Sequence, residues 1–187
     1  TISLMFRDIA GHRPGTITKV GLKTFVDPRI EGAKMNERSK EDLVELMHID
    51  GEEWLRYKSF PLNVALIRAT YCDEDGNATM EKEAATLDSL SIAQAAKNSG
   101  GIVLLQVEKV VQNGTLDPRK VKIPGIYVDG IVVARPENHW QTYANPYDPA
   151  LSGEVKVPVN SIAPMKLNER KVICRRAAME LDPAAII

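Results

Sequence analysis

The sequence has little cysteine, and its two cysteines form no recognisable pattern. Cys72 and Cys174 lie far apart in the chain and lack the spacing of metal-ligand pairs. A disulfide framework and a cysteine-based zinc site are therefore both disfavoured. One accidental pairing stays open, but we expect two free thiols in a reducing cytosol.

The sequence also lacks an excess of charge of either sign and any long hydrophobic run. Its 24 basic and 25 acidic residues give a net charge of −1, whereas nucleic-acid-binding domains usually carry a basic stripe. No stretch approaches the roughly 18 consecutive apolar residues that a membrane-spanning helix requires, and no signal peptide is visible. We therefore expect a cytoplasmic chain without nucleic-acid or membrane partners.

Motifs that would indicate a metal or nucleotide site are incomplete. The acidic segment 73–77 suggests a calcium loop, but an EF-hand needs Gly at its sixth position and Glu at its twelfth, where this chain has Ala78 and Ala84. The spacing of the three histidines is not that of a metal-ligand set: His12, His48 and His139. No P-loop, dinucleotide-binding glycine motif or Gly-x-Ser-x-Gly elbow is present. We predict no metal site and no permanently bound cofactor.

What the chain does contain is a strand–helix–strand pattern at 64–107. Residues 64–71 are mostly apolar and free of Gly and Pro, which suits a strand buried on both faces. A turn-forming segment at 72–77, a helical stretch at 88–98 and a second apolar run at 102–107 follow. Such a crossover places two parallel strands in one sheet and predicts an α/β fold. The helix is expected to pack through one apolar face: Leu87, Leu90, Ile92, Ala93, Ala95 and Ala96.

Several shorter elements are expected in the part of the chain before this pattern. Three elements are predicted at its start: a helix at 4–10, a short strand at 16–20 and a long loop at 21–36. Ser39-Lys-Glu-Asp42 resembles a capping box and indicates a short helix. Asp50-Gly51 then joins residues 43–49 and 52–57 in a β-hairpin.

The residues after the pattern are expected to complete this unit and lead to another. Residues 121–124 and 125–134 are strand candidates, the second of them buried. Five prolines make 136–165 an irregular linker, and 168–181 has the pattern of a helix that opens a second domain. We therefore predict three parts: 1–135, 136–165 and 166–187. Because the chain starts without methionine and stops on the apolar tail 183–187, we expect a piece of a longer polypeptide.

Several short segments, spread from end to end of the chain, match one known family in their order. They are Phe6-Arg-Asp-Ile-Ala10, Pro14-Gly15, Val20-Gly-Leu-Lys-Thr-Phe-Val-Asp-Pro-Arg29, Ala65-Leu-Ile-Arg-Ala-Thr70, Asp73-Glu-Asp-Gly-Asn77, Asn98-Ser-Gly-Gly-Ile-Val103, Gly114-Thr-Leu-Asp-Pro118, Ile123-Pro-Gly-Ile-Tyr-Val-Asp129 and Arg175-Arg-Ala-Ala-Met-Glu-Leu181. Together they resemble the acyl-CoA:carboxylate CoA-transferases, and within this family the propionate and acetate enzymes.

The resemblance implies two related α/β lobes and a ping-pong reaction that moves CoA between a short-chain acyl-CoA and a free carboxylate. A glutamate attacks the thioester to give an acyl-glutamyl anhydride, and CoA thiolate then forms a glutamyl-CoA thioester, from which a second carboxylate takes the CoA. Backbone N–H donors are expected at the oxyanions. The implied partners are acyl-CoA, short-chain carboxylates, a second lobe or subunit that carries the glutamate, and further copies in a homo-oligomer. Coenzyme A is a substrate in this scheme.

The chain departs from the family where the chemistry lies. The nucleophile belongs to a Glu-Ser-Gly or Glu-Thr-Gly motif of the second half, and this chain has only Glu154 after Ser152-Gly153, the reverse order. The glycine-rich segment expected after the helix at 175–181 would begin where the sequence stops. We therefore predict no catalytic residue in this chain. It would comprise a CoA-transferase-like, parallel-rich sheet flanked by helices: the first lobe without its start, the linker, and the opening helix of the second lobe.

The loop at 21–29 is the best candidate for a wall of the substrate cleft, because it resembles the family stretch that faces the other half. Its candidate cleft residues are Gly21, Thr24, Phe25, Asp27 and Arg29. A glycine turn that only orders a sheet edge explains this loop equally well. Asp73 and Asn77 are further candidates, for which a solvated turn after a strand is the simpler explanation.

Two other functions stay open on the sequence alone. A non-catalytic binding or assembly module could have kept this fold. A sugar-phosphate isomerase-type domain has a similar architecture, but this chain lacks residues that support it. A glutamate-containing motif downstream in the longer gene product would distinguish the enzyme from the binding module.

Overall fold

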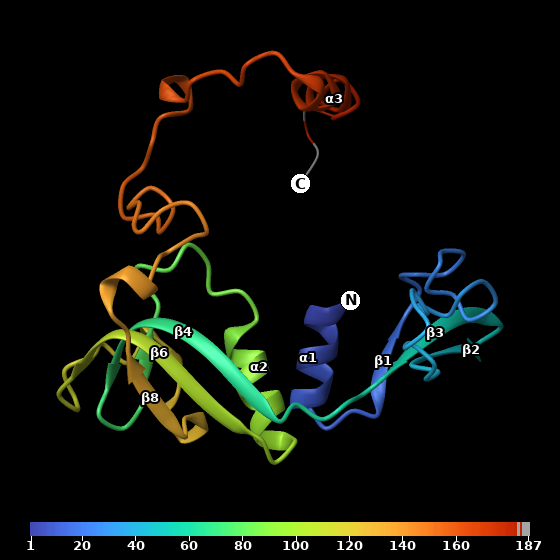
Figure 1. The fold of residues 1–187 in the computed structure, drawn as a ribbon. Helices are drawn as coiled ribbons and strands as arrows, with labels where there is room; N and C mark the ends of the chain where they lie inside the picture. Colours follow the sequence, from blue (N-terminus) through green and yellow to red (C-terminus); the bar gives the residue numbers. More distant parts are fainter. Residues whose placement is uncertain (183, 185–187) are drawn as a thin grey trace.

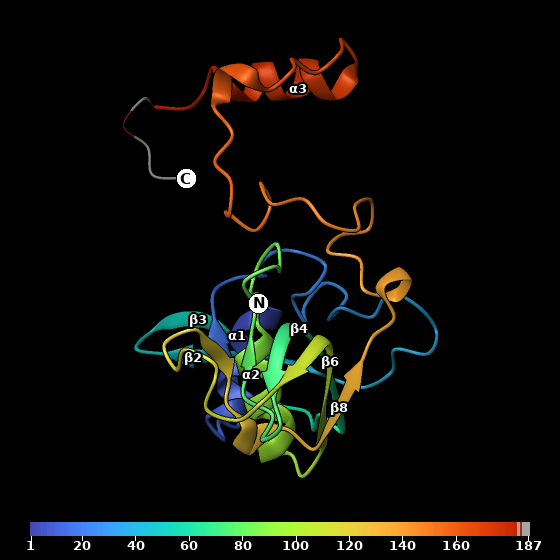
Figure 2. The same ribbon diagram turned by 90° about the vertical axis from the view of Figure 1, so that its left-hand side faces the viewer.

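The computed structural model describes residues 1–182 and 184, and the apolar tail at 183 and 185–187 lies outside the described residues. Two β-sheets lie next to each other, with helix α1 (Ile2–Ala10) between them, and an extended segment leads away to helix α3 (Glu169–Ala178) (Figures 1 and 2). Helix α1 packs both on α2 (Ser89–Asn98) and on the first strand. The chain therefore forms a connected body of two sheets and a separate C-terminal arm.

The larger sheet has five strands in the order β7-β5-β4-β6-β8. Their bounds are β4 (Val64–Asp73), β5 (Ala78–Thr79), β6 (Ile102–Val111), β7 (Val121–Ile123) and β8 (Gly130–Val133). Strand β6 pairs in parallel with both β4 and β8, whereas β5 is antiparallel to β4 and to β7. The predicted parallel crossover and the predicted α/β class are confirmed, in a sheet that mixes two parallel with two antiparallel pairings.

Helix α2 covers one face of this sheet. Its Ala93 and Ala96 are fully buried against alternate strand residues such as Ile67 and Leu105, because alanine allows a helix to approach a sheet closely. The predicted apolar face is wrong at its start. Leu87 precedes the helix in a left-handed conformation, with φ of 46°, and its side chain is 86% exposed.

The smaller sheet has three antiparallel strands, β1 (Gly15–Thr18), β3 (Glu52–Lys58) and β2 (Val44–Ile49), in that order. Asp50 and Gly51 both have positive φ, 52° and 79°, as a two-residue type I′ hairpin requires. The predicted hairpin is therefore confirmed. A small core fills this unit, made of Val44, Leu55 and Tyr57 with Met5, Leu22, Val26 and Leu46.

Two predicted elements are wrong. No helix follows Ser39, because Val44 already begins β2 and the Asp42 carboxylate pairs with Lys34 Nζ at 2.5 Å. The strand predicted at 125–134 is reduced to β8, since Gly125–Tyr127 forms a 3-10 turn, η1. Strand β8 is also not buried. It lies at the edge of the sheet, and Val132 and Val133 are 55% and 57% exposed.

The segment after β8 contains only short helical turns until α3. These are η2 (Pro136–Asn138) and η3 (Val159–Ser161). The predicted helix at 168–181 is confirmed up to Ala178, and the Asn168 side chain caps it by accepting a hydrogen bond from the Lys171 amide at 2.9 Å. No residue of α3 is buried, and Figure 2 shows it well apart from the two sheets.

Candidate functional site

The loop at 21–29 is held together by the carboxylate of Asp27, which is only 1% exposed. One oxygen accepts hydrogen bonds from the amide of Arg29 at 3.1 Å and from its Nε at 3.0 Å. The other accepts from the Lys23 amide at 2.9 Å and from Arg29 Nη2 at 2.8 Å. Arg29 also donates through Nη1 to Glu53 of β3 at 2.7 Å, so the loop is tied to the sheet. The Arg29 guanidinium holds the pKa of Asp27 well below its usual range, and Asp27 raises the pKa of Arg29.

Gly21 lets the loop begin very close to β3. Its φ of +102° lies in the region that favours glycine, and a Cβ at this position would lie 2.4 Å from the phenolic oxygen of Tyr57. The Tyr57 hydroxyl donates a hydrogen bond to the Val20 carbonyl oxygen at 2.7 Å. This contact fixes the entry to the loop and leaves no room for a larger residue.

Phe25 is the candidate side chain that this arrangement leaves free. It is 47% exposed, whereas the Thr24 hydroxyl donates to the Gly21 carbonyl oxygen at 2.8 Å. Asp27 and Arg29 are bound to each other. The five predicted cleft residues thus lie in one loop, with four of them shaping it and an aromatic ring at its surface.

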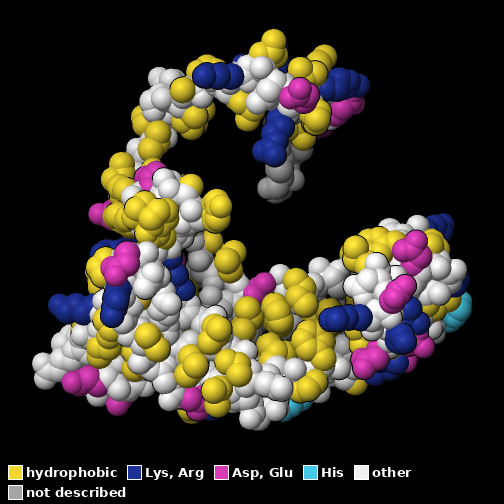
Figure 3. All heavy atoms as spheres, in the orientation of Figure 1, with side chains coloured by type: hydrophobic (Ala, Val, Ile, Leu, Met, Phe, Trp, Pro, Cys, Tyr) yellow, Lys and Arg dark blue, Asp and Glu magenta, His cyan; other side chains and the backbone are white. Residues whose placement is uncertain are grey.

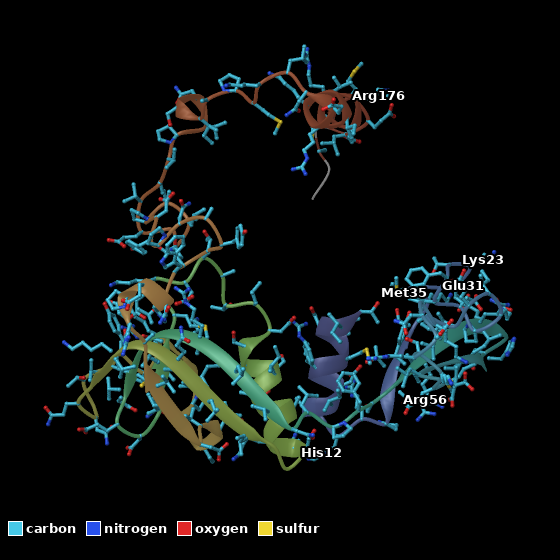
Figure 4. The ribbon with its side chains drawn as sticks, in the orientation of Figure 1. His12, Lys23, Glu31, Met35, Arg56 and Arg176 are labelled. Atoms are coloured by element: carbon cyan, nitrogen blue, oxygen red, sulfur yellow. The ribbon has the colours of Figure 1, made fainter. Side chains whose placement is uncertain are left out.

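Further exposed residues continue from this loop. Figure 4 shows Lys23, Glu31 and Met35 along the upper edge of the smaller unit, and Met35 is largely exposed. His12 lies elsewhere, in the turn after α1. The edge therefore combines apolar and charged groups.

Asp73 and Asn77 close the turn between β4 and β5. One oxygen of the buried Asp73 accepts from the amides of Asp75 and Asn77 at 3.1 and 2.8 Å, and the other accepts from Asn77 Nδ2 at 2.9 Å. Asn77 Oδ1 accepts from the Gly125 amide at 2.9 Å. These side chains belong to the larger sheet and the loop at 21–29 to the smaller one, so the structure does not bring the two predicted sets together (Figure 1).

A charged cavity of about 300 Å³ lies where the linker meets the larger sheet, and the sequence analysis missed it. Arg68 Nε lies 3.0 Å from Glu83 Oε2, and Lys82 Nζ lies 2.8 Å from Glu108 Oε1. The Lys82 ammonium also lies 5.7 Å from the centre of the Tyr147 ring, within cation–π range. Arg68 is the one charged residue in the apolar run 64–71. A charge inside a predicted buried strand is the sequence feature that could have pointed to this cavity.

The environment of this cavity shifts the pKa values of its lining groups. Burial raises the pKa of Glu83 although Arg68 lowers it, and burial lowers the pKa of His139. The hydrogen bond with Glu108 raises the pKa of Lys82, whose carbonyl oxygen accepts from Gln141 Nε2 at 2.7 Å. Arg68 and Lys82 each face a carboxylate, and the contacts of Lys82 with Gln141 and Tyr147 join the linker to the larger sheet.

Residues that could hold a metal or act as nucleophiles are scattered. Across residues 1–182 and 184, no three side chains of His, Cys, Asp or Glu are grouped so that they could bind a metal ion. Cys72 is buried, which raises the pKa of its thiol, and Cys174 is exposed on α3. Both are free thiols, as predicted. The Glu154 carboxylate accepts a hydrogen bond from the Tyr147 hydroxyl.

In the described part of the chain, no helix combines the length and apolar character needed to cross a bilayer.

Comparisons with known proteins match this chain over nearly its full length. The family profile described as Coenzyme A transferase matches residues 6–134. A caffeate CoA-transferase from Acetobacterium woodii is 54% identical over 98% of this chain and 35% of its own length. The crystal structure of acyl-CoA transferase YdiF from Escherichia coli O157:H7 superposes with a TM-score of 0.85 at 44% identity, over 96% of this chain and 34% of that one. A second YdiF structure, a thioester complex with CoA, superposes with a TM-score of 0.84 at 44% identity, over 95% of this chain and 35% of that one. The chain spans about a third of the length of the relatives it matches.

Proposed function

Because the chain belongs to the coenzyme A transferase family, as its sequence predicted, we propose that it is part of an enzyme that moves CoA from a short-chain acyl-CoA to a free carboxylate. The observation that carries this proposal is the 54% identity to caffeate CoA-transferase across 98% of the chain. The YdiF structure in a thioester complex with CoA supports CoA as the substrate. A non-catalytic module has no comparable support.

In the proposed reaction, a glutamate from outside this chain attacks the thioester carbonyl carbon of the acyl-CoA. The C–S bond breaks, CoA leaves as a thiolate, and an acyl-glutamyl anhydride remains. The thiolate then attacks the glutamyl carbonyl, which releases the first acid as a carboxylate and leaves a glutamyl-CoA thioester. A second carboxylate reverses these two steps and regenerates the glutamate.

We assign one wall of the substrate cleft to the loop at 21–29. The ring of Phe25 offers an apolar surface that suits an acyl chain or the arm of CoA. The Asp27–Arg29 pair and the Gly21 turn fix this loop in advance, so little conformational entropy is lost when substrate binds. The second lobe or subunit, which carries the glutamate, faces this loop in our proposal, and the assembled enzyme is a cytoplasmic homo-oligomer.

The test is thioester exchange by the full-length polypeptide. With propionyl-CoA and acetate it should release propionate and form acetyl-CoA, and caffeate should be tried as a second acceptor because of the relative named above. The 187-residue chain alone is expected to show no turnover. Exchange by that chain, or no exchange by the full-length polypeptide with either acid, would contradict the proposal.

Phe25→Ala tests the assignment of the cleft wall. The variant should raise KM by about tenfold, as the loss of an apolar contact in a pocket does, with a smaller effect on kcat. Phe60→Ala is the matched control, because Phe60 is also partly exposed but lies between β3 and β4, outside the loop. Equal changes in the two variants would refute the assignment while leaving the reaction itself untouched.

A further inference from the structure

The first half of the linker is irregular in structure but fixed to the larger sheet, and Gln141 makes the central contact. This residue is only 8% exposed. Its Nε2 donates to the Lys82 carbonyl oxygen at 2.7 Å, and its Oε1 accepts from the Asp148 amide at 2.9 Å. The Gln141 amide donates to the Pro146 carbonyl oxygen at 2.8 Å. Gln141 therefore closes a turn at 141–148 and also binds this turn to the rest of the molecule.

The partner of Gln141 is itself held in place by the larger sheet. Lys82 lies just after β5, and its amide donates to the hydroxyl of the fully buried Thr70 of β4 at 2.9 Å. Its ammonium binds both oxygens of the Glu108 carboxylate, at 2.8 and 2.9 Å, and lies within cation–π range of the Tyr147 ring. Tyr147 belongs to the turn that Gln141 closes, so the turn is attached to Lys82 at two points.

The second half of the linker is exposed to solvent. Every residue from 156 to 168 is exposed, and Figure 3 shows this stretch as a narrow strip of chain that rises away from the sheets. The free tether between the larger sheet and α3 therefore begins near residue 156 and not at the start of the linker. If the turn at 141–148 were released, residues 136–155 would join the tether and make it roughly two and a half times as long.

We propose that Gln141 is a positioning residue of the transfer reaction, because it fixes the point from which the rest of the polypeptide reaches the cleft. This role rests on the proposed function, in which the attacking glutamate lies beyond this chain. The effective concentration of a tethered group falls with about the −3/2 power of the tether length. Release of the turn would therefore make encounters of the glutamate with the thioester about fourfold rarer. Binding of acyl-CoA at the loop 21–29 would stay the same, since this loop does not contact Gln141.

Gln141→Leu in the full-length polypeptide tests this role, because leucine makes neither side-chain hydrogen bond. In exchange between propionyl-CoA and acetate, kcat should fall at least about fourfold, and the KM for propionyl-CoA should change by less than about twofold. Gln94→Leu is the matched control. Gln94 of α2 donates through Nε2 to the Tyr127 hydroxyl at 3.1 Å, away from the linker, so its loss should leave kcat within about twofold of the parent. A drop in Gln141→Leu no larger than in the control would overturn the proposal.

Gln141→Glu separates positioning from a local role in the turn, and it does so even if Gln141→Leu does not fold. The new carboxylate can accept from the Asp148 amide but cannot donate to the Lys82 carbonyl oxygen, whereas its protonated form can do both. Its kcat relative to the parent should therefore rise at least about threefold between roughly pH 8 and pH 5. The neighbouring Glu83, Glu108 and His139 are present in both proteins, so the ratio cancels their titration. A ratio that stays constant with pH would overturn the proposal.

The parent polypeptide distinguishes this role from the proposed function. No exchange by the parent would overturn the proposed function and, with it, the role of Gln141. Exchange by the parent together with equal exchange by Gln141→Leu would overturn the role of Gln141 alone.

Discussion

Replacing Gly21 by alanine should destabilise the smaller unit, and replacing Tyr57 by phenylalanine should partly reverse that effect. The new Cβ would lie 2.4 Å from the Tyr57 hydroxyl oxygen and 3.2 Å from Leu55 Cδ1, at a φ of +102°. A non-glycine residue in the left-handed region costs about 1–2 kcal/mol, and overpacking adds about 1–3 kcal/mol. We therefore expect Gly21→Ala to lower the local unfolding free energy by about 2–5 kcal/mol.

The double variant separates the two contributions. Tyr57→Phe alone removes the hydrogen bond to the Val20 carbonyl oxygen and should cost about 1 kcal/mol. In the double variant the hydroxyl no longer blocks the methyl group, so the backbone strain and the lost hydrogen bond remain, about 2–3 kcal/mol together. The single effects would add to about 3–6 kcal/mol, so the cycle should show a favourable coupling of about 1–3 kcal/mol.

Hydrogen exchange of the β3 amides in the full-length polypeptide measures these local free energies. The amides of α2 serve as the internal control, because α2 packs in the other core and should keep its protection. Additivity of the two substitutions within about 0.5 kcal/mol would refute the steric argument. An equal loss of protection in α2 would show that the effect is not local to the smaller unit.

Two further predictions concern charge and thiol chemistry. Because the folded pKa of Asp27 lies below its ordinary 3.8, its contribution to stability is complete above that pH and is lost as the pH falls through the folded value. The urea midpoint should therefore fall less between roughly pH 5 and pH 2 in Asp27→Asn than in the parent. Asp42→Asn is the control, because its pair with Lys34 is exposed, and its urea midpoint should change with pH as in the parent. The same change with pH in all three proteins would contradict a stabilising role of the Asp27 carboxylate. In the 187-residue chain, Cys174 should react with a maleimide roughly a hundredfold faster than Cys72, which is buried with a raised pKa, and similar rates would show that the core opens readily.

The elements that could be predicted from the sequence are those that neighbouring residues determine. The Asp50-Gly51 hairpin follows from two adjacent residues that tolerate positive φ. The parallel crossover follows from two apolar runs and the helix between them. The helix predicted after Ser39 is wrong because a capping residue stabilises a helix only when the following residues are helical. Here the residues from Val44 onward form strand β2 instead.

Contacts between distant positions account for what could not be predicted. Asp27 and Arg29 are close in sequence, but nothing local shows that Asp27 is buried or that Arg29 reaches Glu53 on β3. The charged cavity pairs Arg68 with Glu83 and Lys82 with Glu108, positions that only the folded sheet and linker bring together. Such pairs have no signature in a single sequence, because each residue alone resembles a solvated charge.

The charged groups of both sites are engaged with one another, and the surfaces left open are apolar. Arg68 lines both the charged cavity and a second hollow, of about 390 Å³, that lies along β4, β6 and β8, and Glu83 already neutralises it. Protein can therefore pack over Arg68 without burying an unpaired charge, which would cost several kcal/mol. The loop differs, since it offers one aromatic ring on a backbone fixed by the buried Asp27. A broad aliphatic face suits a helix, and a single ring on a rigid loop suits a small substrate. This contrast is why we place the acyl-CoA at the loop rather than on the sheet.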